Sequence, residues 1–345
     1  MKRKSLNVKK KTPRNIVQHL SDKNIYKVYN EFKKSLNSQS SYAVALSGGA
    51  DSIALAYLAK CFSKLNNTKI LYFIVDHGLR EESKIEAKKV LLFLKKFKIE
   101  CKILTWKGKK PKSNIQSIAR NKRYNLLIDE CKKNNINNLL IGHHIGDLYE
   151  NFIIRLLRGS GLKGLISLDK AVKDKKSNIH ILRPLINIKK SELINISKKV
   201  FNFYVEDPSN LNEDYKRIRV RKLIENLEFE GLDFKKLQLT IGNLKASNKT
   251  INFYVENNIK NNSTFFKSKN TYSLNDDFFN QPYEIIFRSF SSLLSDISKR
   301  YYPPRGKSVD EIIKKIKSKN FKKATLGGCL IEKINKTVLI SRENL

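Results

Sequence analysis

A regular alternation of short apolar runs with longer helical patterns, beginning at Tyr42, constrains the fold of this chain more than any other feature. Strand patterns are expected at 42–46, 69–76, 99–106, 139–142 and 180–185. Helical patterns follow them at 52–65, 83–97, 115–133, 147–157 and 190–200. Strands that alternate with helices pair in parallel through right-handed crossovers. The sequence therefore predicts an α/β fold, with an open parallel sheet flanked by helices on both faces.

The pattern changes after about residue 221, where the alternation of strands and helices stops. Helical periodicity covers 283–294, and Ser308 with Glu311 has the spacing of a capping box for a helix at 309–316. Apolar runs at 329–333 and 337–341 flank Asn335 and predict a β-hairpin. We expect four regions: a basic arm and helix at 1–40, a catalytic domain at 41–225, a helical region at 226–300, and a small C-terminal α+β domain at 301–345.

The composition favours a polyanionic partner. Among 345 residues, 69 Lys and Arg face 32 Asp and Glu, which gives a formal net charge of +37. Such a charge favours binding to nucleic acid, because Lys and Arg release counterions when they neutralise phosphates. A general richness of the chain in Lys, Asn and Ile would account for about half of this excess of positive charge without any partner. The charge therefore favours RNA as a partner without proving it.

Neither the N-terminus nor the cysteines indicate secretion or a membrane. No run of 18 apolar residues is present, so we expect no membrane span. The basic N-terminus lacks a following apolar segment, which favours a disordered arm over a targeting segment. None of the four cysteines forms a CxxC pair, so we expect buried thiols in a reducing, cytoplasmic compartment. These are Cys61, Cys101, Cys131 and Cys329.

The sharpest local signal is a loop of small residues between the first strand and the first helix of the alternation. Its glycines allow a tight turn and a close ligand, and the helix start offers free N–H groups and a positive dipole end. It lacks the lysine of the GxxxxGK[ST] phosphate loop. A plain turn with Asp51 or Ser52 as the helix N-cap is an equally good interpretation. The loop consists of Ser47, Gly48, Gly49, Ala50, Asp51 and Ser52.

Polar residues that follow other strands favour the ligand-binding interpretation. His77 follows the second predicted strand, and His143 and His144 follow the fourth. In open α/β sheets, ligands bind beyond the carboxyl ends of the strands, which is the edge where the loop lies. Asp76, Arg80 and Asp147 are expected there too. Two adjacent histidines are poorly spaced for one metal ion, so contacts to phosphate and base are preferred.

At this point the chain resembles a known group of enzymes. SGGADS after a strand is similar to the SGGxDS loop of the N-type ATP pyrophosphatases, or PP-loop enzymes. Further segments resemble the tRNA(Ile)-lysidine synthases of that superfamily. They are IVDHGLR (74–80), ARNKRYNLL (119–127), GHHIGDLYENFIIRLLRGSGLKGL (142–165), LRPL (182–185), EDPSN (206–210), the basic run 215–221 and TLGGCLI (325–331). The resemblance covers residues 40–225 densely and 300–342 thinly.

The chain departs from the family pattern in the helix that follows the two histidines. The family usually has Asp-Asp-Gln where this chain has Gly146, Asp147 and Leu148, and Asn151 replaces the usual Thr. Asp147 and Glu150 still keep two carboxylates one helical turn apart. With Gly146 in place of an acid, the role that this acid has in the family must be absent here or be taken by another residue. The length also leaves no room for a second large C-terminal domain, so the chain resembles a shorter form.

The resemblance implies an ATP-dependent ligase that makes lysidine. The enzyme would transfer AMP to the oxygen on carbon 2 of the first anticodon cytidine of the minor tRNA(Ile) with a CAU anticodon, and would release pyrophosphate. Free L-lysine would then displace AMP and change the tRNA from methionine to isoleucine identity. ATP and Mg²⁺ are the implied cofactors. The residues leave the metal ligands and the oligomeric state open.

The resemblance also assigns site residues. ATP binding is assigned to the loop 47–52 and His77, and catalysis to Asp51, His144, Asp147 and Glu150. Which group takes the proton of lysine stays open among the last three. Contacts to tRNA are expected from the following residues and from the helical region 226–300. For each arginine, a solvated helix face or an ion pair is an equally good interpretation. These residues are Arg80, Arg120, Arg123, His143, Arg155, Arg158, Arg217, Arg219 and Arg221.

Two rival functions are weighed against this one. Another PP-loop enzyme, such as a tRNA thiolase, would need a reactive cysteine or a cluster, and none of the four cysteines lies in such a setting. A non-catalytic RNA-binding relative would explain Gly146. The intact loop, together with Asp147 and Glu150, argues against it.

Overall fold

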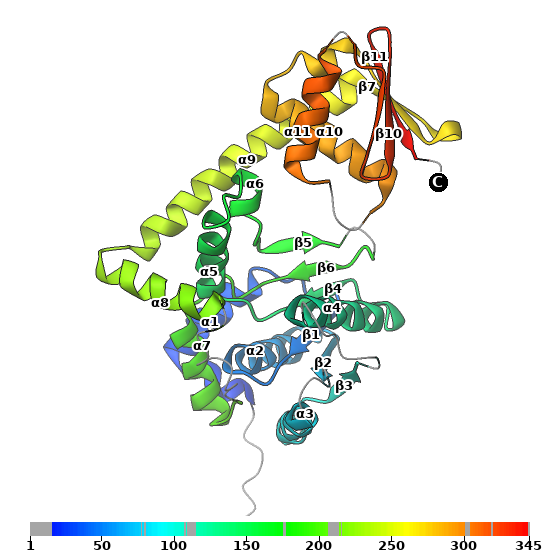
Figure 1. Ribbon diagram of the computed structural model, residues 1–345. Coiled ribbons are helices and arrows are strands. Elements are labelled where there is room, and N and C mark those ends of the chain that lie inside the picture. The colour runs from blue at the N-terminus through cyan, green and yellow to red at the C-terminus, as the bar shows by residue number, and fades with distance from the viewer. Residues whose placement is uncertain are drawn as a thin grey trace, which may run out of the picture. The chain divides into compact units, whose positions relative to one another are not determined.

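The computed structural model describes residues 16–76, 78, 81–106, 108, 115–174, 177–205, 214, 216–300, 304–318 and 320–343. His77, Arg80 and the segment 206–210 lie outside the described residues. The chain divides into two compact units, Met1–Leu232 and Asp233–Leu345 (Figure 1). The four regions expected from the sequence stay predictions.

The first unit contains a six-stranded sheet with the order β3-β2-β1-β4-β6-β5. Five strands are parallel, as predicted, but β5 pairs with β6 in the antiparallel direction. The sequence analysis missed β5 because its three residues are all exposed and show no apolar run. The strands are β1 Tyr42–Leu46, β2 Ile70–Asp76, β3 Cys101–Thr105, β4 Asn138–Leu140, β5 Ala171–Lys173 and β6 His180–Leu182.

Helices cover both faces of this sheet, which confirms the predicted layers. Successive residues of β1 point to opposite faces. Val44 packs with α2, α3 and α7 in one apolar cluster, whereas Ala43 packs with Leu127 and Cys131 of α4 in another. The helices are α1 Lys23–Lys33, α2 Ala50–Asn66, α3 Glu81–Lys95, α4 Ile115–Lys133, α5 Ile145–Leu156, α6 Leu162–Leu165, α7 Lys190–Ile196 and α8 Lys216–Phe229, with a 3₁₀ turn at Ile16–Ser21.

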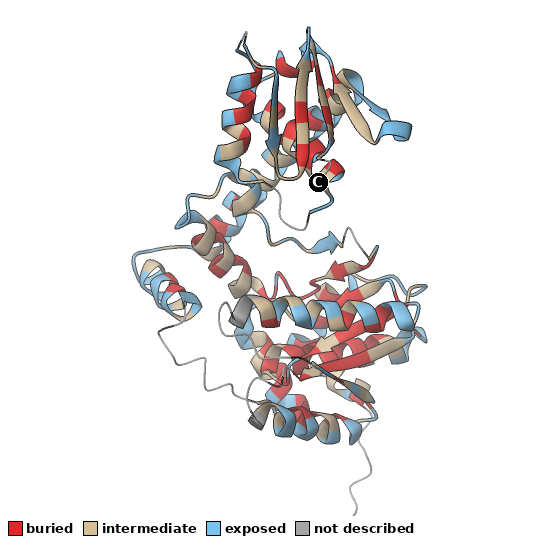
Figure 2. Cartoon of the chain, turned by 45° about the vertical axis from the view of Figure 1, so that its right-hand side comes forward, coloured by how far each residue is buried: buried red, intermediate tan, exposed pale blue. Residues whose placement is uncertain are grey.

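Two helix ends differ from the sequence prediction. The helix expected at 190–200 is α7, followed by a π-helical turn at Ser197–Phe201. The helix expected to begin at Asp147 begins two residues earlier, because His144 caps it. The central helix is α2, which is buried along most of its length. Buried residues gather in the strands of the first sheet and on the sides of the helices that face it (Figure 2). The start of α2 is therefore held firmly against the sheet.

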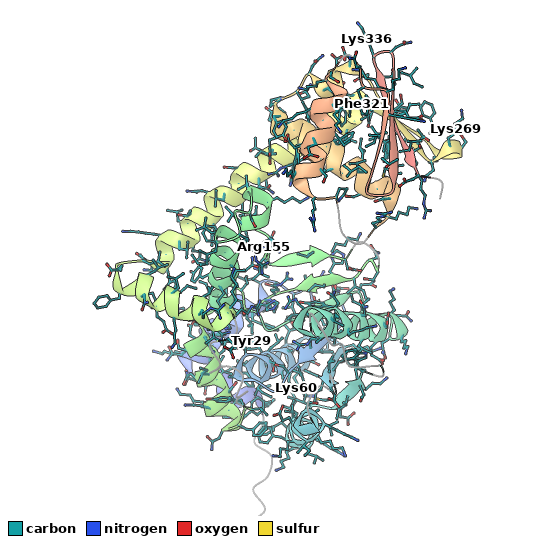
Figure 3. All side chains as sticks on the ribbon, viewed as in Figure 1. Tyr29, Lys60, Arg155, Lys269, Phe321 and Lys336 are labelled. Atoms are coloured by element: carbon teal, nitrogen blue, oxygen red, sulfur yellow. The ribbon has the colours of Figure 1, made fainter. Side chains whose placement is uncertain are left out.

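The second unit contains a five-stranded antiparallel sheet with the order β7-β8-β11-β10-β9. The predicted hairpin is confirmed as β10 and β11, with Lys336 at its tip (Figure 3). The strands β7 and β8 lie within the region expected to be helical, and β8 pairs with β11 of the hairpin. The strands are β7 Ser263–Phe266, β8 Thr271–Leu274, β9 Lys323–Leu326, β10 Cys329–Ile334 and β11 Thr337–Arg342.

Three helices pack with this sheet around one apolar core. The helices are α9 Phe234–Asn262, α10 Tyr283–Ser298 and α11 Gly306–Ile316, with 3₁₀ turns at Lys267–Lys269 and Asp276–Phe279. The capping box predicted from Ser308 and Glu311 is wrong, because α11 begins at Gly306 and Arg305 is its N-cap. Among the described residues of both units, no helix is long and apolar enough to cross a membrane.

We predict that Phe290→Ala destabilises the second unit by about 3–5 kcal/mol, because truncating a fully buried Phe loses its burial and leaves a cavity. Phe253→Ala, at a position 59% exposed, is the matched control and should change stability by less than about 0.5 kcal/mol. Urea unfolding, followed by hydrogen exchange of the β10 and β11 amides, measures both. Equal effects of the two variants would contradict this core assignment.

Candidate active site

The loop 47–52 connects β1 to α2 at the point where the chain order of the strands reverses. From β1 the chain moves to β2 on one side, and β4 lies on the other. Gly48 has a φ of +87°, and a Cβ there would lie 2.8 Å from Cγ2 of Val90. Its carbonyl accepts a hydrogen bond from the amide of Val205 at 3.0 Å. Glycine is thus required by both the backbone angle and the neighbouring side chain.

The hydroxyl groups of the loop hold its shape. Ser52 Oγ donates to the carbonyl of Gly49 at 2.9 Å and accepts from the amide of Ser47 at 3.2 Å. Helix α2 begins after Gly49, and no side chain caps it, so neither Asp51 nor Ser52 is the N-cap. The first N–H groups of a helix have no partner within the helix. The loop therefore offers amides and a positive dipole end to an anion such as a phosphate.

The end of β4 approaches the first turn of α2 closely. A Cβ on Gly142 would lie 3.4 Å from the backbone of Asp51, which is van der Waals contact distance. His144 follows, is only 4% exposed, and caps α5. Its Nε2 lies 3.7 Å from Oδ2 of Asp51 and 3.7 Å from Oδ2 of Asp147. Three of the predicted catalytic residues thus meet beside the loop.

The ring of His144 is held in one orientation. Nδ1 accepts a hydrogen bond from the amide of Gly146 at 3.0 Å, and Oδ2 of Asp147 accepts from the amide of His144 at 3.0 Å. Because Nδ1 is an acceptor, the proton of a neutral ring is assigned to Nε2. His144 therefore presents an N–H group to the two carboxylates.

The two carboxylates differ in their environment. Burial raises the pKa of Asp51, although the nearby His144 opposes this shift. Burial also raises the pKa of Asp147, but the charges of His144 and His143 and the backbone hydrogen bond outweigh it, so the net pKa is lowered. Oδ1 of Asp51 is buried without a hydrogen-bond partner. This oxygen is available to a ligand.

Glu150 lies one turn further along α5 and is 3% exposed. Its Oε1 accepts a hydrogen bond from Nε of Arg221 at 2.6 Å, and its Oε2 is buried without a partner. Burial lowers the pKa of Arg221, but the bond to Glu150 outweighs it and the net pKa is raised. The structure places Arg221 against this carboxylate, and its expected contact with tRNA stays a prediction.

His143 makes a contact that the sequence analysis missed. Nε of Arg183 donates to Nδ1 of His143 at 3.0 Å, and Nη1 of Arg183 donates to the carbonyl of Asp169 at 2.7 Å. Arg183 is buried and lies in the LRPL segment, directly after β6. The sequence did offer a signal for this contact, because Arg183 lies towards the carboxyl end of the strand predicted at 180–185 and so at the same sheet edge as the histidines. Burial lowers the pKa of His143 to about 4.

The remaining predicted arginines differ in their surroundings. Arg120 is exposed and donates to the hydroxyl of Tyr124 at 3.2 Å. Arg217 is exposed on α8, and its charge lowers the pKa values of both His143 and Asp147. Arg219 donates to the carbonyl of Asp214 at 2.9 Å. Of the others, Arg155 is half-buried near the end of α5 (Figure 3), and two are exposed, Arg123 and Arg158.

This chain is similar to several known proteins. The model of the PP-loop domain family matches residues 18–227. A tRNA(Ile)-lysidine synthase of Wolbachia pipientis wMel is 34% identical over 326 residues, covering 91% of this chain and 74% of the relative. One of Rickettsia bellii (strain OSU 85-389) is 33% identical, covering 92% and 74%.

Among solved structures, the U34-tRNA thiolase NcsA from Methanococcus maripaludis with its [4Fe-4S] cluster has a similar fold. The TM-score is 0.53 at 22% sequence identity, over 62% of this chain and 76% of that one. The fold and the loop define this chain as a PP-loop ATP-binding protein. More narrowly, the chain belongs to the tRNA(Ile)-lysidine synthase family.

We predict that the ring of His143 stays neutral down to about pH 4 in the folded protein. Its folded pKa lies below the unfolded value of about 6.5, so the unfolded chain binds the proton first. The contribution of the neutral ring to the free energy of unfolding is therefore fully present above about pH 6.5 and is lost as the pH falls towards 4. Histidine NMR titration and urea midpoints measure the effect, which His143→Gln should remove. Titration of His143 near pH 6.5 would contradict the burial argument.

Proposed function

We propose that this protein ligates free L-lysine to carbon 2 of the first anticodon cytidine of tRNA(Ile) with a CAU anticodon, using ATP, in the cytoplasm. The observation that carries the proposal is the meeting of Asp51, His144 and Asp147 beside the uncapped start of α2. Glu150 lies one helical turn further along α5. This arrangement combines a phosphate-binding turn with buried acids. Membership of the lysidine synthase family supports the same reaction.

In the first step, the oxygen on carbon 2 of the cytosine would attack the α-phosphorus of ATP. The bond to the β-phosphate breaks and pyrophosphate leaves, so AMP becomes bound to that oxygen. The amides at the start of α2 would hold the polyphosphate. The unpartnered carboxylate oxygen of Asp51 fits a hard cation, so Asp51 would hold Mg²⁺. Bound Mg²⁺ supplies compensating charge for the phosphates.

In the second step, the ε-amine of lysine would attack carbon 2, and AMP would leave with the original oxygen. Lysine has a reference pKa near 10.4, so its ammonium group must lose a proton before it attacks. The Nδ1 atom of His144 already accepts a hydrogen bond, which disfavours His144 as the base. Oε2 of Glu150 is buried and unpartnered, while Arg221 fixes Oε1. We therefore assign the amine and its proton to Glu150.

The tRNA would approach the carboxyl edge of the first sheet. The anticodon loop is single-stranded, so the cytosine can enter a pocket without breaking a duplex. Exposed Arg120, Arg217 and Arg219 support phosphate contacts there. The net charge of +37 supports long-range attraction of the tRNA. The region 226–300 stays our proposal for contacts to the body of the tRNA.

Sulfur transfer is the less suitable alternative. Burial raises the pKa of Cys61, Cys101 and Cys131 to about 12, and that of Cys329 to about 11. A thiol must ionise to act as a nucleophile, so these four residues are poor sulfur carriers. A non-catalytic role is disfavoured because two buried carboxylate oxygens without partners are costly unless a ligand satisfies them.

We predict that the purified protein, with ATP and labelled lysine, will label the minor tRNA(Ile) and release pyrophosphate. Asp51→Ala should lower pyrophosphate release by about 100-fold or more, because it removes the acid at the phosphate-binding turn. Filter binding of labelled tRNA and a pyrophosphate assay measure the two products. A folded, tRNA-binding protein that transfers no label would refute the proposed reaction.

We predict that Glu150→Gln separates the two steps. The amide can still accept from Arg221 but cannot take a proton, so lysidine formation should fall by about 100-fold or more. Pyrophosphate release that depends on tRNA should remain within about threefold of the wild type. Single-turnover measurement of both products tests this split. Full lysine transfer by Glu150→Gln would remove Glu150 from the role of base.

A further inference from the structure

Position 146 is the clearest departure of this chain from the family pattern, which has an acid there. Gly146 lies in the first turn of α5, and its φ is negative, so the backbone does not require glycine. Glycine also weakens a helix relative to alanine. The reason for glycine at this position must therefore come from a neighbouring group.

That neighbour is the ring of His144. A Cβ on residue 146 would lie 2.8 Å from Cε1 and 3.0 Å from Nδ1 of His144, which is closer than real Cβ contacts allow. The ring is buried between the carboxylates of Asp51 and Asp147, so it is not a flexible end that can move aside cheaply. Any side chain at position 146 would turn the ring and break its bond to the amide of residue 146.

We propose that Gly146 is a positioning residue, whose missing side chain lets His144 fold over the start of α5 and direct its Nε2–H group at Asp51. Asp51 belongs to the phosphate-binding turn, so the ring connects the start of α5 to that turn. The chain thus leaves the space at position 146 to the ring of His144, where the family pattern has an acidic side chain. Only the predicted change in the rate of lysidine formation rests on the proposed function; the position of the ring does not.

The consequence is opposite to what family resemblance suggests. Gly146→Asp restores the usual acid but adds the same Cβ, so it should lower activity instead of raising it. Gly146→Ala should lower it as well, by at least about tenfold in kcat for lysidine formation. The KM for tRNA should change by less than about threefold, because the exposed arginines are untouched.

The test uses the full chain and reads the ring directly. Long-range ¹H–¹⁵N NMR of labelled histidine should show His144 of the wild type as a single tautomer, with the proton on Nε2. Gly146→Ala should shift these signals or mix the tautomers. Gly242→Ala is the stability control, because a Cβ there meets nothing within 4 Å and only helix propensity changes. Gly242→Ala should unfold at a urea concentration no lower than the wild type, whereas Gly146→Ala should unfold at a lower one because of the clash, while staying folded in the assay without urea.

Several results would overturn the inference. These are a proton on Nδ1 of His144 in the wild type, unchanged His144 signals in Gly146→Ala, or full activity of Gly146→Asp. Failure of the wild type to form lysidine would refute the proposed function alone. The NMR comparison would still test the ring in that case.

Discussion

The structure depends on the close approach of two loops at the carboxyl edge of the first sheet. Gly48 lets the chain turn directly from β1 into α2, and the end of β4 lies against the first turn of that helix at Gly142. Because α2 is buried along most of its length, this first turn cannot move independently of the sheet. The positions of Asp51 and His144 follow from this contact. The site is therefore as rigid as the core beneath it.

Electrostatics give this edge its chemical character. A chain with a net charge of +37 gathers three acids, Asp51, Asp147 and Glu150, at a half-buried centre. Histidine and arginine groups offset part of the desolvation, since Arg221 holds Glu150 and His144 lies between the other two. Two carboxylate oxygens nevertheless lack partners. Buried acceptors of this kind suit cationic ligands, which is why we propose a metal ion at Asp51 and the amine of lysine at Glu150.

Most of the first unit could be predicted from the sequence because its elements have strong local patterns. The strands β1 to β4 and the helices between them appear as apolar runs and helical periodicity that depend on near neighbours only. The short edge strand β5 and the strand β7 were missed because exposed residues form most of them. The strand β8 was missed because its pairing with the distant strand β11 has no local pattern in the sequence. The predicted capping box of α11 was wrong although Ser308 and Glu311 have the required spacing, because the helix begins at Gly306, before Ser308.

In the candidate site, too, local features could be predicted from the sequence, whereas contacts between distant residues could not. The sequence by itself determined the order of the elements, the tight turn at 47–52 and the residues that follow each strand, because these depend on local geometry. Only the tertiary structure decided that Arg221 binds Glu150, that buried Arg183 binds His143, and that the ring of His144 occupies the space left by Gly146. These contacts join side chains whose distances depend on packing, and no local pattern in the sequence encodes such distances.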